Sequence, residues 1–182
     1  MKKFSVKTIA AIIAGAALFF VLGRFVSIPS PIPDTNISIQ YGVLAFVSAL
    51  FGPIAGFFTG LIGHFFIDFS KNLAYGDTIW WSWIGASAFF GLVMGLAAGK
   101  INMESGEFEK KEIIYFNVAQ ILTHLISWLI LAPVLDVLIY KELASEAFVQ
   151  GAFCMVSNAV ATAVVGTLLC VSYAASKPRK GE

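Results

Sequence analysis

The chain has 182 residues, of which 58% are hydrophobic and only 13% charged, and its net charge is +1. Ordinary globular domains carry about 25% charged residues, because a small fold exposes much of its surface to water. This composition excludes a soluble enzyme, a secreted disulfide scaffold and a disordered protein, and the net charge leaves no basic surface for nucleic acid. We therefore expect an integral membrane protein.

Long hydrophobic runs follow one another along the chain. A membrane-spanning helix needs about 20 mostly apolar residues. The runs are continuous rather than alternating, which favours helices over a closed barrel. We expect a single all-α membrane domain over residues 1–182, with six transmembrane helices at about residues 7–28, 36–51, 53–69, 78–99, 112–131 and 147–175.

Helix-breaking and polar residues separate the predicted helices. Three prolines between residues 29 and 33 cannot continue the first helix. Gly52 and Pro53 predict a tight turn, in which glycine ends one helix and proline begins the next. Pro133 either ends or kinks the fifth helix. Polar segments at residues 71–77, 100–111 and 136–146 predict the longer loops.

Lysine and arginine lie mostly on one side of this arrangement. Six spans place both termini on the same side, and nine of the twelve basic residues fall there. The other side carries only Arg24, Lys71 and Lys141, together with several acidic residues. Because an excess of positive charge marks the cytoplasmic side, we expect both termini to be cytoplasmic.

Small residues recur at four-residue spacing in three predicted helices, which places each set on one helix face. Such faces let helices approach closely. We interpret the sets in the third and fourth helices as internal packing surfaces. Ala10 and Ala14 in the first helix form a face that could instead dock a second membrane protein. The internal sets are Gly52, Gly56 and Gly60, and Ser87, Gly91, Gly95 and Gly99.

Polar side chains within spans are costly in lipid and indicate function by default. In the third predicted helix, His64 and Asp68 are neighbours at i,i+4. In the fifth, a polar stripe occupies one face. The helical rise places most of these groups in the outer half of the membrane, which predicts an outward-facing pocket rather than a pore. The stripe consists of Asn117, Gln120, His124 and Trp128, and the other outer groups include Arg24, Gln150 and Asn158.

Structural roles compete with functional ones at two of these positions. Arg24 either snorkels to the outer interface or pairs with Asp68 or Asp34. The His64–Asp68 pair either forms a structural hydrogen bond or contributes to a site.

Three tryptophans lie at the outer end of the fourth predicted helix. Trp80 and Trp81 occupy the depth at which an aromatic belt is expected. Trp83 lies half a turn deeper and is the better candidate for stacking on a ligand.

Enzyme motifs are missing from the sequence. There is no phosphate-binding G-x-x-x-x-G-K-[ST], no G-x-S-x-G and no H-E-x-x-H. His64 and Asp68 have no third or fourth metal ligand nearby in sequence, so we expect neither a cofactor nor a metal. The alternative is an intramembrane enzyme or metal-binding membrane protein that uses His64, Asp68 and His124.

Three stretches together carry a resemblance that covers the whole chain. They are Ala10-Ala11-Ile12-Ile13-Ala14, Gly23-Arg24-Phe25-Val26-Ser27-Ile28-Pro29 and Leu50-Phe51-Gly52-Pro53-Ile54-Ala55-Gly56. With six helices, an outward pocket and no ATP site, the chain resembles the substrate-binding S component of an energy-coupling factor (ECF) transporter. It is similar to a poorly assigned branch of the riboflavin-type group.

This resemblance implies a non-catalytic subunit of an ATP-driven importer in a prokaryotic plasma membrane. It implies capture of a vitamin or vitamin precursor at the extracellular side, beneath the loop that joins the first two helices. It also implies that Ala10 and Ala14 dock on a transmembrane coupling subunit driven by two ATP-binding subunits.

Relatives of this branch suggest hydroxymethylpyrimidine as the ligand. A small planar pyrimidine suits Trp83 or Trp128 for stacking, and polar side chains for hydrogen bonds at the ring edge. The expected substrate-binding residues are Asp68, His64, His124, Gln120, Trp83, Trp128, Asn158 and Arg24.

Overall fold

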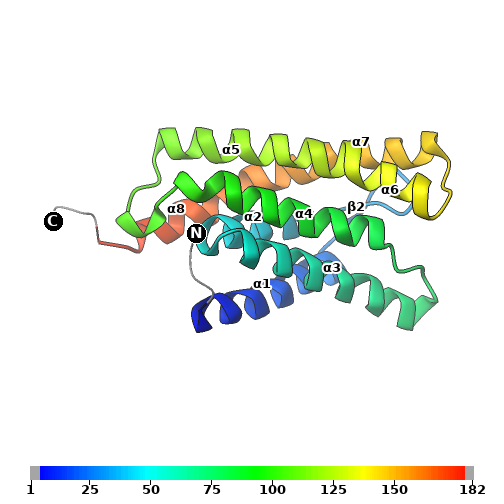
Figure 1. Cartoon of the computed structure of the whole chain (residues 1–182), viewed down its shortest axis with the longest axis horizontal. Helices are drawn as coiled ribbons and strands as arrows, with labels where there is room; N and C mark the ends of the chain where they lie inside the picture. The colour runs from blue at the N-terminus through cyan, green and yellow to red at the C-terminus, as the bar shows by residue number, and fades with distance from the viewer. Residues whose placement is uncertain (1–4, 179–182) are drawn as a thin grey trace.

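The computed structural model describes residues 5–178 and shows a bundle of helices with one short hairpin (Figure 1). Lys2, Lys3, Arg179 and Lys180, which contributed to the expected orientation, lie outside the described residues. The helices are α1 (Val6–Phe25), α2 (Gln40–Phe51), α3 (Pro53–Tyr75), α4 (Trp81–Ala97), α5 (Lys110–His124), α6 (Ala132–Ile139), α7 (Ala144–Ala161) and α8 (Thr167–Ala175). Short elements complete the chain: strands β1 (Ile28–Pro29) and β2 (Asn36–Ile37), 3-10 turns η1 (Ala98–Lys100) and η2 (Met103–Ser105), and π-helical segments η3 (Leu125–Leu131) and η4 (Thr162–Gly166).

Five continuous helices in the described chain are long and apolar enough to cross a membrane. They are α1, α3, α4 with η1, α5 with η3 and α6, and α7 with η4 and α8. The sixth, α2, has only 12 residues, about 18 Å of helix against a hydrocarbon core of about 30 Å. The expected all-α membrane architecture is confirmed, with one helix shorter than a full span.

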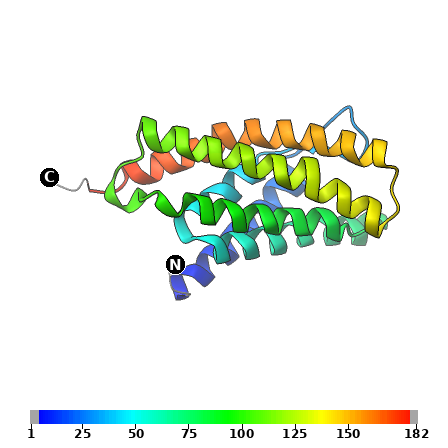
Figure 2. The same ribbon diagram turned by 45° about the horizontal axis from the view of Figure 1, so that its top comes forward.

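The two ends of the bundle differ in their connections. Figures 1 and 2 show α1 beginning and α8 ending at the same end, where the segment between α4 and α5 also lies. The β1–β2 hairpin and the α3–α4 and α6–α7 connections lie at the other end. We call the latter the hairpin end.

Helix α2 forms the centre of the bundle. Nearly every residue from Gln40 to Leu50 is buried, which is typical of a helix surrounded by others. Gly42 packs directly on the η4 segment, since a Cβ there would collide with Val165. The hairpin strand β2 comes just before the N-terminal end of this central helix.

The small-residue interpretation holds for α3 and α4. A Cβ on Gly56 would collide with the carbonyl oxygen of Gly91, and one on Gly60 with that of Ser87. The two backbones therefore touch along this face, as small-residue spacing predicts. Gly52 adopts φ +93° and Pro53 begins α3, which confirms the predicted tight turn.

Helix ends near prolines differ from the predicted ones. Helix α1 ends at Phe25 rather than residue 28, and α2 begins at Gln40 rather than residue 36. The residues between them pair as antiparallel strands, Ile28 with Ile37 and Pro29 with Asn36, because the residue before a proline favours extended backbone.

The fifth predicted helix continues past Pro133 to Ile139. The π-helical segment η3 precedes this proline, and the Ala132 N–H bonds to the Ser127 carbonyl, five residues back. The wider turn accommodates a residue that has no N–H to donate. Asp136 therefore belongs to a buried helix face and not to the expected loop. Likewise α3 extends to Tyr75, so most of the expected loop at 71–77 is helical.

Candidate functional site

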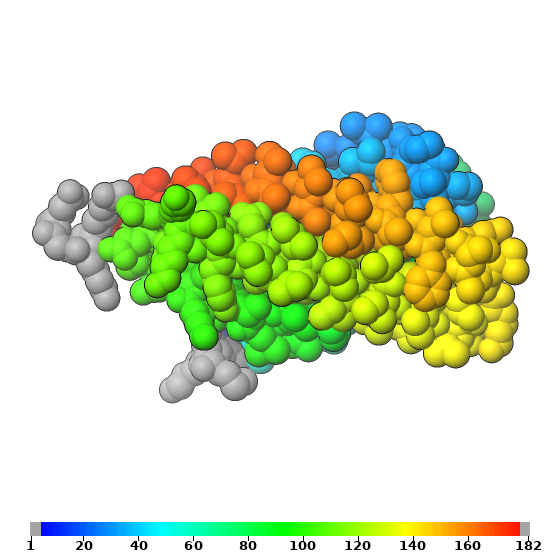
Figure 3. Space-filling model, turned by 90° about the horizontal axis from the view of Figure 1, so that it is seen from above, coloured from blue at the N-terminus to red at the C-terminus, as the bar shows by residue number. Residues whose placement is uncertain are grey.

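A cavity of about 960 Å³ opens at the hairpin end of the bundle. Residues of the hairpin segment, α2, α3, α4, η3, α6 and α7 line it. The segment between α1 and α2 lies beside α7 in the space-filling view of Figure 3, and the Gln150 side chain donates to the Pro33 carbonyl at 3.2 Å. The volume is at the upper end of the range for small-molecule sites.

Two indole rings form an aromatic wall of the cavity. Trp83 from α4 and Trp128 from η3 both line it, with ring centroids 5.7 Å apart and planes only 17° from parallel. Tyr41 from α2 packs edge-on against Trp128 at 5.0 Å. Because the rings stack on each other and Trp128 is only 1% exposed, the flat apolar surface left to a planar ligand is mainly that of Trp83.

His124 lies beneath Trp128 and holds it in place. The indole Nε1–H of Trp128 donates to Nδ1 of His124 at 2.8 Å, and Nε2 of His124 lies 3.0 Å from the Thr162 hydroxyl. Since Nδ1 accepts a hydrogen bond, the neutral ring carries its proton on Nε2 and donates to Thr162. His124 is fully buried and does not line the cavity. It positions the aromatic wall.

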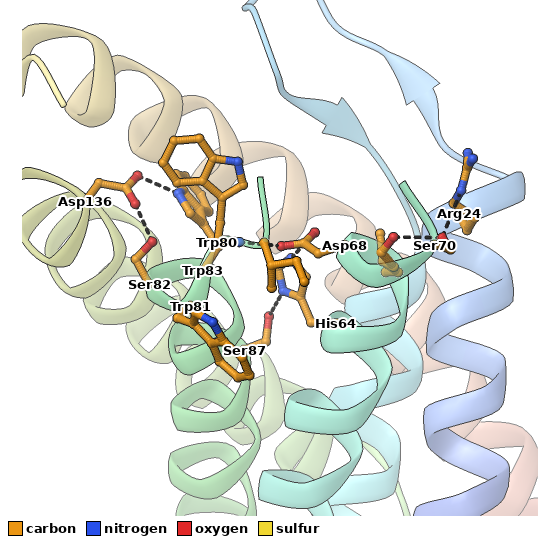
Figure 4. A network of polar contacts seen from close by, with 12 residues as sticks. Arg24, His64, Asp68, Ser70, Trp80, Trp81, Ser82, Trp83, Ser87 and Asp136 are labelled. Carbon is orange, nitrogen blue, oxygen red and sulfur yellow. Dashed lines mark hydrogen bonds and ion pairs between the residues drawn. The ribbon is translucent and has the colours of Figure 1, made fainter. Parts of the chain in front are cut away.

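A hydrogen-bonded chain reaches the cavity from α2 through α4 to α3. Figure 4 shows its part from Ser87 through His64 and Asp68 to Trp80. The Tyr41 hydroxyl lies 2.9 Å from the Ser87 hydroxyl, which lies 2.6 Å from Nδ1 of His64. Nε2 of His64 lies 3.8 Å from a carboxylate oxygen of Asp68, whose other oxygen accepts from the Trp80 backbone N–H at 2.9 Å. At this distance the two side chains form no direct hydrogen bond; each is held by other partners, and both line the cavity.

A second carboxylate, Asp136, meets the other side of the Trp80–Trp83 segment (Figure 4). It accepts hydrogen bonds from the Ser82 hydroxyl and, at 2.5 Å, from the indole N–H of Trp83. Asp136 is 2% exposed and lines the cavity. Asp136 thereby fixes the orientation of the Trp83 ring.

The side chain of Asn158 on α7 also lines the cavity. It is 4% exposed, yet its amide makes no hydrogen bond with any residue in 5–178. Buried amides are normally satisfied. An unpartnered amide at a cavity wall is therefore a contact available to a ligand.

The cavity brings together most, but not all, of the residues that the sequence indicated. Gln120 is fully buried below it, donating to the Ala159 carbonyl at 3.2 Å. Arg24 donates to Ser70 at 3.1 Å and lies over the rings of Phe25 and Tyr75, away from the cavity. It pairs with neither of the two aspartates proposed for it. The predicted residues that line the cavity are His64, Asp68, Trp83, Trp128 and Asn158.

His64, Asp68 and His124 do not share a site. Both ring nitrogens of His124 bond to Trp128 and Thr162, and in the described part of the chain no three His, Cys, Asp or Glu side chains gather as metal ligands. The geometry gives no support to the alternative of an intramembrane enzyme or metal site built from these three residues.

Several cavity residues were missed by the sequence analysis. Tyr41 lines the cavity, but no pattern in the sequence singled it out, and Trp80 was assigned to an aromatic belt although it also lines the cavity. Ser87, assigned to a small-residue packing face, does not line the cavity but bonds to Tyr41 and His64, which do. The sequence did contain a signal for Asp136, because it continues the four-residue spacing of His124, Trp128 and Ala132 on one helix face. The proline at 133 concealed that continuity.

Comparison with known proteins finds a matching family and bacterial relatives along nearly the whole chain. Residues 3–175 match the family described as ECF-type riboflavin transporter, S component. A UPF0397 protein of Lacticaseibacillus casei (strain BL23) is 47% identical over 180 residues, which cover 99% of this chain and 95% of the relative. A UPF0397 protein of Staphylococcus aureus (strain Newman) is 46% identical over 183 residues, covering 100% and 97%. No solved structure matches.

S components are non-catalytic, multi-pass subunits of the prokaryotic plasma membrane. They bind a small-molecule substrate and work with ECF transmembrane and ATP-binding subunits. The match over nearly the whole chain, the apolar helices and the cavity at one end of the bundle agree with this role. The chain belongs to the S-component family of ECF-type transporters.

Proposed function

We propose that this S component captures a small planar heteroaromatic ligand in the cavity at the hairpin end, with hydroxymethylpyrimidine as the first candidate. The stacked pair of Trp83 and Trp128 carries the proposal, since both rings line the cavity. A pyrimidine ring on this wall would have Asp68 and Asn158 within the same cavity for hydrogen bonds at its edge. His64 belongs to the same site, while His124 and Gln120 act from below.

The distribution of lysine and arginine supports one orientation of the chain in the membrane. We propose that the whole chain acts as one six-helix domain with its termini in the cytoplasm, so that the hairpin end faces the outside. The segment between α4 and α5 carries Lys100, and α5 begins with Lys110 and Lys111. These residues lie at the end of the bundle where α8 ends. The positive-inside tendency supports this orientation.

The segment between residues 29 and 36 is then a lid over the cavity. It is ordered by its own hydrogen bonds: Ser30 N–H donates to the Thr35 carbonyl at 3.2 Å, and the Thr35 hydroxyl to the Ile32 carbonyl at 2.7 Å. Its prolines limit the freedom of the open state. Closure over a ligand would therefore cost little conformational entropy.

Helix α1 is the proposed docking surface for the coupling subunit, which two ATP-binding subunits would drive. One face of α1 packs inward, where a Cβ on Gly15 would touch Val47 and Thr59. On the outward face Ala10 and Ala14 are exposed. Small exposed residues let a partner helix approach closely.

The ligand is tested by mass spectrometry of small molecules retained by the purified chain, followed by equilibrium binding of hydroxymethylpyrimidine and, for comparison, riboflavin. We expect the pyrimidine to be retained and Trp83→Ala to weaken its binding by about 5- to 100-fold, since base–aromatic stacking is worth about 1–3 kcal/mol. Arg24→Gln, outside the cavity, is the control. Binding that is unaffected by Trp83→Ala would remove the aromatic wall from the site.

A further inference from the structure

We propose that the ligand held in this cavity is an organic cation, and that the carboxylates of Asp68 and Asp136 are its counter-ions. This inference rests on the function proposed above and adds the charge of the substrate to it. Three independent features of the cavity carry it: its charge, its aromatic wall and its unpartnered amide.

The lining of the cavity is strongly acidic. One lysine, Lys71, stands against six carboxylates in the described residues that line it. Low-dielectric walls with one sign of charge concentrate ligands of the opposite sign. The cavity therefore repels anions and attracts cations before any specific contact forms. The six are Asp34, Asp68, Asp77, Asp136, Glu142 and Glu146.

Two of these carboxylates are buried without a lysine or arginine partner. Asp68 is 6% exposed and Asp136 2%. Neither forms an ion pair with a lysine or arginine anywhere in residues 5–178. Asp68 lies beside His64 and accepts from the Trp80 backbone N–H, and Asp136 accepts from the neutral donors of Ser82 and Trp83. An uncompensated charge at this depth is costly, and a bound cation would remove that cost.

The aromatic wall favours the same kind of ligand. Trp83 receives its orientation from Asp136, and the segment that begins with Trp80 bonds to Asp68. A flat cation that lies on these rings gains a cation–π attraction as well as apolar contact. Its positive edge would then lie within the same wall as both carboxylates.

The amide of Asn158 supplies the third feature. It is buried at the cavity wall and has no hydrogen-bond partner among the described residues. A cation that carries several N–H groups, such as an amidinium or a protonated aminopyrimidine, can donate to the Asn158 oxygen and to a carboxylate at once.

A metal ion is a poorer occupant. No three side chains of His, Cys, Asp or Glu in the described chain are grouped as ligands, and a bound metal ion generally needs at least three or four. The two carboxylates lie on opposite sides of the Trp80–Trp83 segment (Figure 4), which suits an extended organic cation.

The test compares two planar probes of the same shape, the cation benzamidinium and the neutral benzamide, by titration calorimetry of the purified full chain in detergent at pH 7. We expect benzamidinium to bind at least 10-fold more tightly. Asp68→Asn and Asp136→Asn should each weaken it by about 10- to 100-fold, the size of a lost charged hydrogen bond. Asp68→Asn should leave benzamide nearly unchanged, and Asp136→Asn, which also alters the contact to Trp83, should weaken benzamidinium more than benzamide. Glu107→Gln removes the same charge from an exposed position between η2 and α5 and is the matched control.

The outcomes separate this inference from the proposed function. Equal binding of both probes would overturn the cationic assignment. So would a retained natural ligand that is neutral and binds the Asp68→Asn variant as tightly as the unaltered chain. Capture of a ligand in the cavity would still stand in both cases. Loss of all small-molecule binding would refute the proposed function itself. If either variant fails to fold, the preference of the unaltered chain between the two probes still decides the question.

Discussion

Replacing His124 with leucine tests whether the hydrogen bond beneath the aromatic wall stabilises the site. Leucine has about the volume of histidine, so the change removes polarity without opening a large void. It takes away the acceptor for the Trp128 indole N–H and the donor to Thr162, both of which are buried.

The structure sets the size of the effect. A buried donor left unpaired costs about 1–3 kcal/mol. Trp128 is 1% exposed and its N–H has no other partner among the described residues. The Thr162 hydroxyl loses less, because it can turn to the carbonyl four residues earlier in its helix. We expect His124→Leu to lower the unfolding free energy by about 2 kcal/mol and to weaken ligand binding about 2- to 10-fold through a less ordered Trp128.

A double-mutant cycle with Trp128→Phe isolates the bond. Phenylalanine keeps an aromatic ring but has no N–H, so the penalty for an unpaired donor disappears once His124 is leucine. Unfolding in mixed micelles should show a coupling of about 1–2 kcal/mol between the two positions. Effects that add within about 0.5 kcal/mol would show that the hydrogen bond contributes nothing and that only packing matters here.

Three further predictions address packing, docking and the lid. Gly91→Ala should lower the unfolding free energy by about 3 kcal/mol, because the added Cβ would collide with the α3 backbone. The control Gly85→Ala lies on the same helix with open space at its Cβ and should be neutral or slightly stabilising. Similar losses of stability in the two variants would contradict the backbone contact. Ala14→Trp should abolish co-purification with the coupling subunit, and therefore uptake by reconstituted vesicles, while the isolated chain still binds ligand; normal assembly would move the docking surface elsewhere. Gln150→Ala removes the contact with Pro33 and should raise the ligand dissociation rate about 2- to 10-fold in stopped-flow measurements; an unchanged rate would exclude the segment as a lid.

Much of the site could be anticipated along single helices. Spacing by four residues placed His64 with Asp68 and His124 with Trp128, and both pairs are in contact. Spacing says nothing about which pair reaches the cavity. His124 turned out to support the site from below, because it lies on the same helix face as Trp128 but one turn deeper, beneath the ring that lines the cavity.

The predicted end of the fifth helix was wrong, because packing in the folded chain overrides the local effect of a proline. Pro133 is a reliable helix breaker in isolation. Here the π-helical segment before it absorbs the missing hydrogen bond, and the helix continues to Asp136, whose carboxylate bonds to Ser82 and Trp83 more than fifty residues earlier.

The sequence by itself determined that this chain lies in a membrane, that it crosses as helices, and that two helices touch through small residues. Those properties depend on apolar content and on periodicity, which are local and additive. Only the tertiary structure decided which polar groups share a cavity, that Asp136 orients Trp83, and that Asn158 has no partner. These depend on the rotation and depth of each helix against its neighbours, which arise from close packing between residues far apart in the chain.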